Sequence, residues 1–238
     1  MKRIALPQTR ALALPDGRSL ELELRRSVRA RNMLIRILEV EGRAELVLPR
    51  RVTVAEGWRF AEEKARWIDA RLASLPPHVP FEHGASVLYG GAPLRLFHDA
   101  SRRRGTPVRD GGGLMVPGPI ERMSQAVLRW YVAEARRELG GRAFALAERI
   151  GRNVQRLTIR DPETRWGSCS SAGHLSFSWR LMMAPGLVAD YVVAHEVAHL
   201  KAMHHGRSFW ALVDELFGDP DAPRRWLNDH GLMLRRYG

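Results

Sequence analysis

Cysteine is nearly absent from this chain, and its absence limits the covalent chemistry that the protein can use. The 238 residues include one cysteine, Cys169. A single thiol excludes an intrachain disulfide and fits a reducing compartment. We expect Cys169 to be a small buried side chain rather than a catalytic nucleophile.

Long apolar runs are missing as well. No stretch reaches the ~18–20 apolar residues that a helix needs to cross a bilayer. The first 17 residues begin with basic side chains, but prolines interrupt their short apolar stretches, which makes a poor signal peptide. A hydrophobic content of 45% and a charged content of 27% are ordinary for a globular protein. We therefore expect a cytoplasmic protein without membrane contact, and its oligomeric state stays open.

Lysine is scarce, although the formal net charge is +12. Of the 38 basic residues only three are lysine. A positive charge of this size invites a nucleic-acid partner. The arginines are scattered along the chain, however, and so strong an arginine skew can reflect genome composition. We favour a solvated basic surface, and nucleic-acid binding stays an open alternative.

The first half of the chain shows mostly strand patterns. Polar and apolar residues alternate over residues 19–24, and a hairpin is expected over residues 33–48 with Gly42 in its turn. Consecutive glycines between short apolar runs predict two more hairpins, over residues 86–98 and 108–116.

One helix interrupts these strands. Residues 54–75 carry an apolar stripe at helical spacing, and the proline-rich stretch 76–80 ends it as a stiff connector. The Pro-Gly-Pro stretch 117–119 marks the expected boundary between two regions. We therefore predict a β-rich N-terminal region, 1–118, and a catalytic region, 119–238.

The second half alternates strands and helices. Residues 120–150 have helical periodicity with Gly140-Gly141 as an expected weak point, and residues 154–160 and 175–180 are predicted strands. Further helices are expected from Pro185 onward, over 209–217 and over 222–234. The predicted fold class is α+β, with a small antiparallel sheet preceding a helix that carries the motif described next.

The most informative stretch is residues 190–210, which contain the pattern H-E-x-x-H in an apolar helical segment. His195 and His199 are four residues apart, so they lie on the same helix face and can reach one cation. Glu196 is rotated about 100° from His195, and can therefore hold a water at the metal rather than ligate it. Catalytic zinc has three protein ligands and a water.

The third ligand is predicted to be His205. Five residues separate it from His199, enough to finish the helix and bend back. Gly206 suits such a bend because glycine tolerates positive φ. His204 and His230 are the alternatives.

Four segments around the motif are distinctive: RWGSCS at 165–170, LSFSWRL at 175–181, AP at 184–185 and DYVVAHE at 190–196. In these segments the sequence resembles the YgjP-like metallopeptidase family, bacterial proteins described as metal-dependent hydrolases of uncharacterised substrate. The later HGxxFW resembles the family's His-Ser-x-x-Phe-Trp, with Gly206 in place of serine. The resemblance is most specific over residues 154–215. It implies a zincin-like catalytic half, zinc at His195, His199 and His205, and a catalytic Glu196.

The predicted function is a zinc-dependent metallopeptidase with one Zn²⁺ per chain, in which Glu196 activates the metal-bound water. Its substrate would be an unidentified protein or peptide. One alternative is a nucleic-acid-associated protease, because the family is distantly similar to the SprT-like and Wss-like proteases that act on DNA-bound proteins. Metzincins share the ligand spacing, but Ala202 replaces their glycine. Another alternative is a non-catalytic zinc-stabilised binding module, which Glu196 argues against because structural zinc sites favour four protein ligands.

A substrate-binding edge is expected in the strands before the motif. An exposed sheet edge within residues 166–179 can pair with an extended peptide through main-chain hydrogen bonds. The candidate substrate-binding residues are Trp166, Gly167, Ser168 and Tyr191. For Trp166 and Trp179, a core position and a substrate contact remain equally open.

Overall fold

The computed structural model describes residues 8–14 and 16–238, and it confirms the α+β fold class. The chain forms two compact units, residues 1–77 and 78–238. This division lies ahead of the boundary predicted after residue 118. The reason is packing: Leu96 and Leu114, from the strands before residue 118, share one hydrophobic core with Tyr131 and Phe177 behind it.

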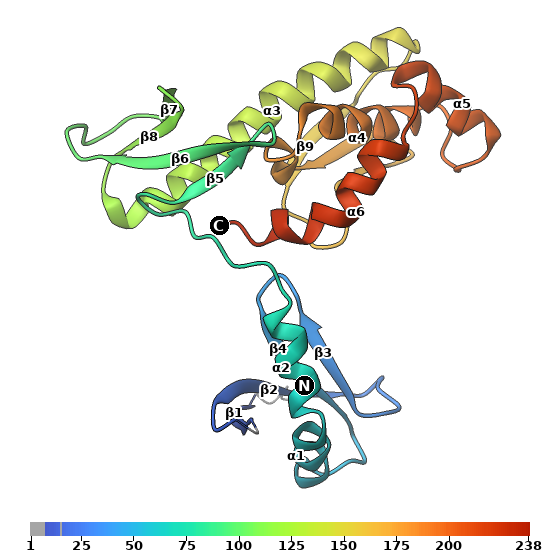
Figure 1. The fold of residues 1–238 in the computed structure, drawn as a ribbon. Coiled ribbons are helices and arrows are strands. Elements are labelled where there is room, and N and C mark those ends of the chain that lie inside the picture. The colour runs from blue at the N-terminus through green and yellow to red at the C-terminus, as the bar shows by residue number, and fades with distance from the viewer. Residues whose placement is uncertain (1–7, 15) are drawn as a thin grey trace, which may run out of the picture. The chain divides into compact units, whose positions relative to one another are not determined.

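The first unit is a four-stranded sheet with two short helices (Figure 1). Its strands, in the order β1-β2-β4-β3, are β1 (Gln8–Ala13), β2 (Ser19–Ser27), β3 (Leu34–Leu38) and β4 (Arg43–Pro49). The predicted single helix is two helices, α1 (Val54–Glu63) and α2 (Ala65–Ala73). At Lys64, between them, φ is −97° and ψ is 3°, which departs from helical values. Buried Trp58 and Ile68 place the predicted apolar stripe in this unit's core.

The second unit begins with a four-stranded sheet that packs against a long helix. The strands, in the order β5-β6-β8-β7, are β5 (Ser86–Tyr89), β6 (Ala92–Asp99), β7 (Val108–Asp110) and β8 (Gly113–Pro117). The predicted hairpin turn at Gly90-Gly91 is confirmed, with φ of 60° and 82°. A 3₁₀ turn, η1 (Ile120–Arg122), leads into α3 (Met123–Arg149). The helix continues through Gly140 and Gly141, so the predicted weak point does not interrupt it.

A three-stranded sheet precedes the motif helix. It consists of β9 (Arg156–Arg160), β10 (Gly167–Cys169) and β11 (His174–Ser178) in the order β10-β11-β9. The sheet is mixed rather than wholly antiparallel: β10 pairs antiparallel with β11, whereas β9 pairs parallel with β11. This order leaves β10 at an edge of the sheet.

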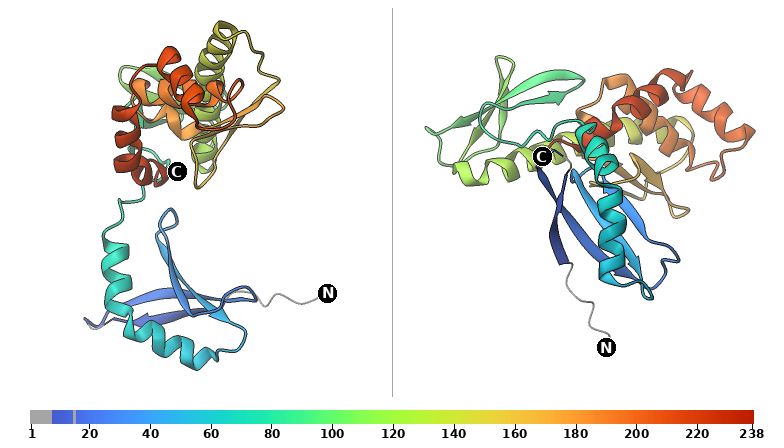
Figure 2. Two further views of the ribbon diagram at one scale, coloured as in Figure 1. Left: turned by 90° about the vertical axis from the view of Figure 1, so that its right-hand side faces the viewer. Right: turned by 60° about the horizontal axis from the view of Figure 1, so that its bottom comes forward.

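The motif helix is α4 (Gly186–Ala198). The other helical segments of this part are η2 (Trp179–Met182), α5 (Arg207–Leu216) and α6 (Asp221–Arg235). Helix α4 packs against α3, α5, α6 and strand β10 (Figure 2). In the described part of the chain, no helix combines the length and apolar character that a membrane crossing requires.

Candidate metal centre

The site is built on α4, a helix that is apolar on nearly every side. Its sequence, GLVADYVVAHEVA, contains no glycine or proline after the first turn, and nine of its 13 residues are buried. A helix that is hydrophobic all round belongs in a core. On this helix Glu196 is buried and His195 is half-buried, and His199 follows directly as the C-cap residue.

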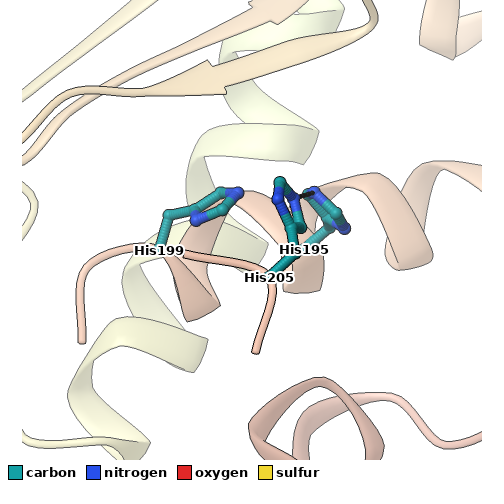
Figure 3. A group of neighbouring side chains, drawn as sticks. All are labelled: His195, His199 and His205. Atoms are coloured by element: carbon teal, nitrogen blue, oxygen red, sulfur yellow. Dashed lines mark hydrogen bonds between the residues drawn. The ribbon is translucent and has the colours of Figure 1, made fainter. Parts of the chain in front are cut away.

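The structure brings His195, His199 and His205 together. One nitrogen from each imidazole lies within 4.8 Å of the other two (Figure 3). The Nε2 atoms of His195 and His205 are 3.1 Å apart. Two nitrogens bound to one tetrahedral zinc ion at 2.0–2.1 Å would be about 3.3 Å apart. The donor set and its spacing fit a zinc-like divalent cation.

Neighbouring groups orient the imidazoles. His199 Nδ1 lies 3.1 Å from the carbonyl oxygen of Ala202, which can only accept, so Nδ1 carries the proton and Nε2 keeps its lone pair. The Tyr191 hydroxyl lies 3.4 Å from His195 Nδ1. The buried ring of Phe209 packs against all three imidazoles, with centroids 4.5–4.9 Å away. Such supports hold metal ligands in place.

The alternative third ligands lie elsewhere. His204 is exposed and outside the cluster, and His230 stacks on Trp226 with its Nδ1 3.0 Å from that residue's carbonyl oxygen. The expectation that Gly206 adopts a positive φ was wrong. Its φ is −84°, because it starts α5 as the N-cap residue instead of making a left-handed turn.

Burial dominates the electrostatics of the site. It raises the pKa of Glu196 to about 7, and the charge of Arg165 opposes this rise. The pKa of His195 falls to about 4 because of burial, followed by repulsion from His199, His205 and Arg224. Neutral imidazoles are the form that binds metal.

The four candidate substrate-binding residues all lie at this site. Trp166, Gly167 and Tyr191 line a cavity of about 300 Å³ next to His195 and Glu196. Ser168 lines a neighbouring cavity that contains the three histidines. Trp179 is separate: it is 2% exposed and belongs to the core.

Cys169 shares that neighbouring cavity but is not a strong nucleophile. It is half-buried rather than fully buried. Burial, and then the charge of Glu196, raise the pKa of its thiol to about 11. The thiol is therefore protonated at neutral pH, as expected for a non-catalytic cysteine.

Three polar residues that line the cavity beside Glu196 were not predicted from the sequence as site residues. They are Arg165, Arg224 and Asn228. Arg165 begins the RWGSCS segment, so its place in that motif was an available signal. Arg224 and Asn228 come from α6, and nothing in the local pattern of α6 distinguishes them from its other polar residues.

The comparisons with known proteins agree with this geometry. The family model described as "YgjP-like, metallopeptidase domain" matches residues 31–230. No curated protein and no solved structure matches the chain. Since the match spans most of the sequence and includes all three clustered histidines, this chain belongs to the YgjP-like metallopeptidase domain family.

Proposed function

We propose that the protein is a zinc-dependent metallopeptidase that holds one Zn²⁺ per chain. His195, His199 and His205 are the proposed ligands, and Glu196 is the proposed catalytic residue. The observation that carries the proposal is the convergence of three imidazole nitrogens within 4.8 Å beside a buried carboxylate. Three neutral nitrogens leave a coordination position open, as catalytic zinc requires.

The chemistry divides between the cation and the chain. When bound, a divalent cation supplies Lewis acidity, which lowers the pKa of a coordinated water and polarises a carbonyl group. Glu196 accepts a proton from the attacking water at its carboxylate and returns it to the leaving amine nitrogen. Its position on α4, 7% exposed, keeps bulk water from competing for that proton.

Strand β10 is suited to hold an extended substrate. The Ser178 N–H donates to Trp166 O and the Ser170 N–H to His174 O, so these residues form hydrogen-bonded pairs across the strands. Such pairs alternate along an antiparallel ladder. The main-chain groups of Gly167 and Cys169 consequently point away from β11, toward the free edge. A peptide that adds a strand there would lie beside Glu196.

The test compares the wild-type protein with Glu196→Gln and with Glu215→Gln, an exposed control on α5. Metal content is measured by mass spectrometry. Hydrolytic activity is measured with a peptide library. We expect Glu196→Gln to keep its metal and lose hydrolysis by roughly 10²–10⁴-fold, the usual contribution of general acid–base catalysis. Glu215→Gln should match the wild type. A Glu196→Gln protein that keeps both metal and full activity would refute the mechanism.

One observation favours a second candidate function, a protease docked on nucleic acid. Strands β2 and β4 run parallel, with Ser27 opposite Pro49. The segments that follow them therefore leave the same end of the sheet. They carry exposed arginines, namely Arg29, Arg31, Arg50 and Arg51. Guanidinium groups gathered in this way suit phosphate backbones.

This candidate is tested by titrating labelled DNA at several salt concentrations. If the protein binds through phosphates, the logarithm of the binding constant should fall steeply and linearly with the logarithm of the salt concentration. Replacing the four arginines by glutamine should flatten that slope, whereas the exposed controls Arg59→Gln and Arg66→Gln should leave it nearly unchanged. Absence of binding at low salt would eliminate this function.

A further inference from the structure

The cavity beside Glu196 has a charge pattern that the proposed hydrolysis does not use. Its volume is about 300 Å³, and it is lined in part by Trp166, Tyr191 and Leu227. Besides Glu196, its charged lining residues are two arginines, Arg165 and Arg224. The cavity therefore combines apolar walls with an excess of positive charge over the single carboxylate.

The two arginines reach the cavity from separate parts of the chain. Arg165 lies in the segment before β10, whereas Arg224 lies in the first turn of α6. The guanidinium carbon of Arg224 is 5.5 Å from the centroid of the Trp210 ring, a cation–π contact that limits where the side chain can go. Two unrelated segments thus place guanidinium groups around one space.

Neither guanidinium forms an ion pair with a carboxylate of the protein, although the charge of Arg165 lowers the pKa of Glu196. The ion pairs formed by residues 8–14 and 16–238 include neither Arg165 nor Arg224, and every Asp and Glu of the chain lies within those ranges. Some other arginines of this unit do form ion pairs with carboxylates. Arg142 pairs with Asp190 and Glu138, and Arg180 with Asp161.

We propose that this cavity binds a carboxylate group of the substrate and that Arg165 and Arg224 hold it. This inference rests on the proposed peptidase function. The planar guanidinium fork matches a carboxylate with two parallel hydrogen bonds, and apolar walls strengthen such charge-assisted bonds. Asn228, on the α6 turn after Arg224, adds an amide donor to the same cavity.

The carboxylate could come from two places in a peptide. It is either an acidic side chain near the scissile bond or the free carboxyl group at the C-terminus. Both present the same chemistry to the arginines. The first source would make the protein an endopeptidase with an acidic preference, and the second would make it a carboxypeptidase.

The experiment uses four matched peptides that combine an aspartate or an asparagine side chain with a free or an amidated C-terminus. Binding to the metal-loaded Glu196→Gln protein is measured by fluorescence anisotropy, and kcat/KM is measured with the wild type. We expect the peptides with a recognised carboxylate to bind about 10- to 100-fold more tightly, as charge-assisted hydrogen bonds allow. Tighter binding of aspartate than of asparagine peptides identifies an acidic side chain as the source. Tighter binding of free than of amidated peptides identifies the C-terminal carboxyl group.

Two variants and one control test the arginines. In the Glu196→Gln background, Arg165→Gln and Arg224→Gln should each reduce the preference to less than about 10-fold. Arg225→Gln, an exposed neighbour on α6 outside the cavity, should leave it unchanged. Circular dichroism shows whether each variant folds. Because the two arginines lie on separate segments, the second variant still tests the proposal if the first one misfolds. The same two substitutions are also made with Glu196 intact, where a role in stabilising the oxyanion would instead lower kcat for all four peptides equally and would overturn the proposal.

The outcomes separate this inference from the proposed function. Equal binding and equal cleavage of all four peptides would overturn the carboxylate site and leave the peptidase intact. Arginine-dependent binding without cleavage by the wild type would support the carboxylate site and reject the peptidase. Absence of binding by every peptide would overturn the carboxylate site.

Discussion

Gly167 and Glu196 meet at a point where only a hydrogen atom fits between them. A Cβ atom on Gly167 would lie 2.5 Å from Glu196 Cγ and 2.7 Å from Oε1. The φ of Gly167 is not positive, so space rather than backbone conformation requires glycine here. The main chain of the edge strand β10 therefore packs directly against the Glu196 side chain at Gly167.

Gly167→Ala should displace the Glu196 carboxylate. The added methyl group cannot coexist with the present position of Glu196 Cγ, and a displacement of about 1 Å at a reacting group can cost roughly 10²-fold in rate. We expect that loss in kcat, with the metal content unchanged. Gly141→Ala is the matched control: Gly141 is exposed on α3 with open space around it, so alanine should raise stability by roughly 0.5–1 kcal/mol and leave kcat unaffected. Normal turnover by Gly167→Ala would show that this contact does not position the carboxylate.

The third ligand can be tested with two adjacent histidines. His205→Ala removes a nitrogen from the cluster, whereas His204→Ala removes an exposed side chain outside it. We expect His205→Ala to weaken zinc binding by at least about 100-fold, because even groups that only support metal ligands contribute 10- to 100-fold. His204→Ala should bind like the wild type. Competition with a chromogenic chelator measures both affinities, and equal affinities would remove His205 from the proposed ligand set.

The motif geometry could be predicted because it is local. Helical spacing alone places His195 and His199 on one face, and a short return loop is long enough to bring His205 to them. Strands and helices were predicted where apolar periodicity continued over many residues. The break at Lys64 was missed because the apolar stripe continues across it.

The remaining features depend on long-range packing. Gly206 was expected to make a left-handed turn, but the start of α5 determines its φ. Arg224 reaches the cavity only because α6 packs against α4, a relationship with no trace in the local sequence. The division after Pro77 coincides with the proline-rich connector, and the shared core explains why the stretch 117–119 does not divide the second unit.

Arg180 should stabilise the second unit by joining three of its segments. Its guanidinium group donates two hydrogen bonds to Asp161, at 2.7 and 3.0 Å, and further bonds to the carbonyl oxygens of Leu234 and Tyr237, both at 2.7 Å. Arg180→Met leaves the carbonyl oxygens of Leu234 and Tyr237 without this donor, whereas water can solvate Asp161, which is 45% exposed, so the free energy of unfolding should fall by about 1–3 kcal/mol. Arg71→Met removes an exposed pair with Glu39 and should cost at most about 1 kcal/mol. Urea unfolding measures both, and similar small losses would contradict the proposed role.

Tyr89 and Glu134 form a contact whose strength should depend on pH. The Tyr89 hydroxyl donates to a Glu134 carboxylate oxygen at 2.8 Å. Burial raises the pKa of Glu134, but hydrogen bonds from Arg137 and Tyr89 and the nearby positive charges outweigh it, so the pKa lies below its usual 4.5. A carboxyl group with a depressed pKa in the folded state contributes stability above its unfolded pKa and loses it as the pH falls through the folded value.

Tyr89→Phe should therefore destabilise the protein more at pH 7 than in acid. At pH 7 the lost bond is made to a charged acceptor, and we expect a cost of about 1–2 kcal/mol in the free energy of unfolding. Below pH 4.5 Glu134 takes up a proton, first in the unfolded chain and then in the folded one, so the difference between wild type and variant should shrink. Urea unfolding over this pH range measures the difference, and Glu134→Gln in both backgrounds is the control, because it should remove the pH dependence. A difference that stays constant between pH 7 and pH 3 would show that the Tyr89 bond contributes nothing to the low pKa of Glu134.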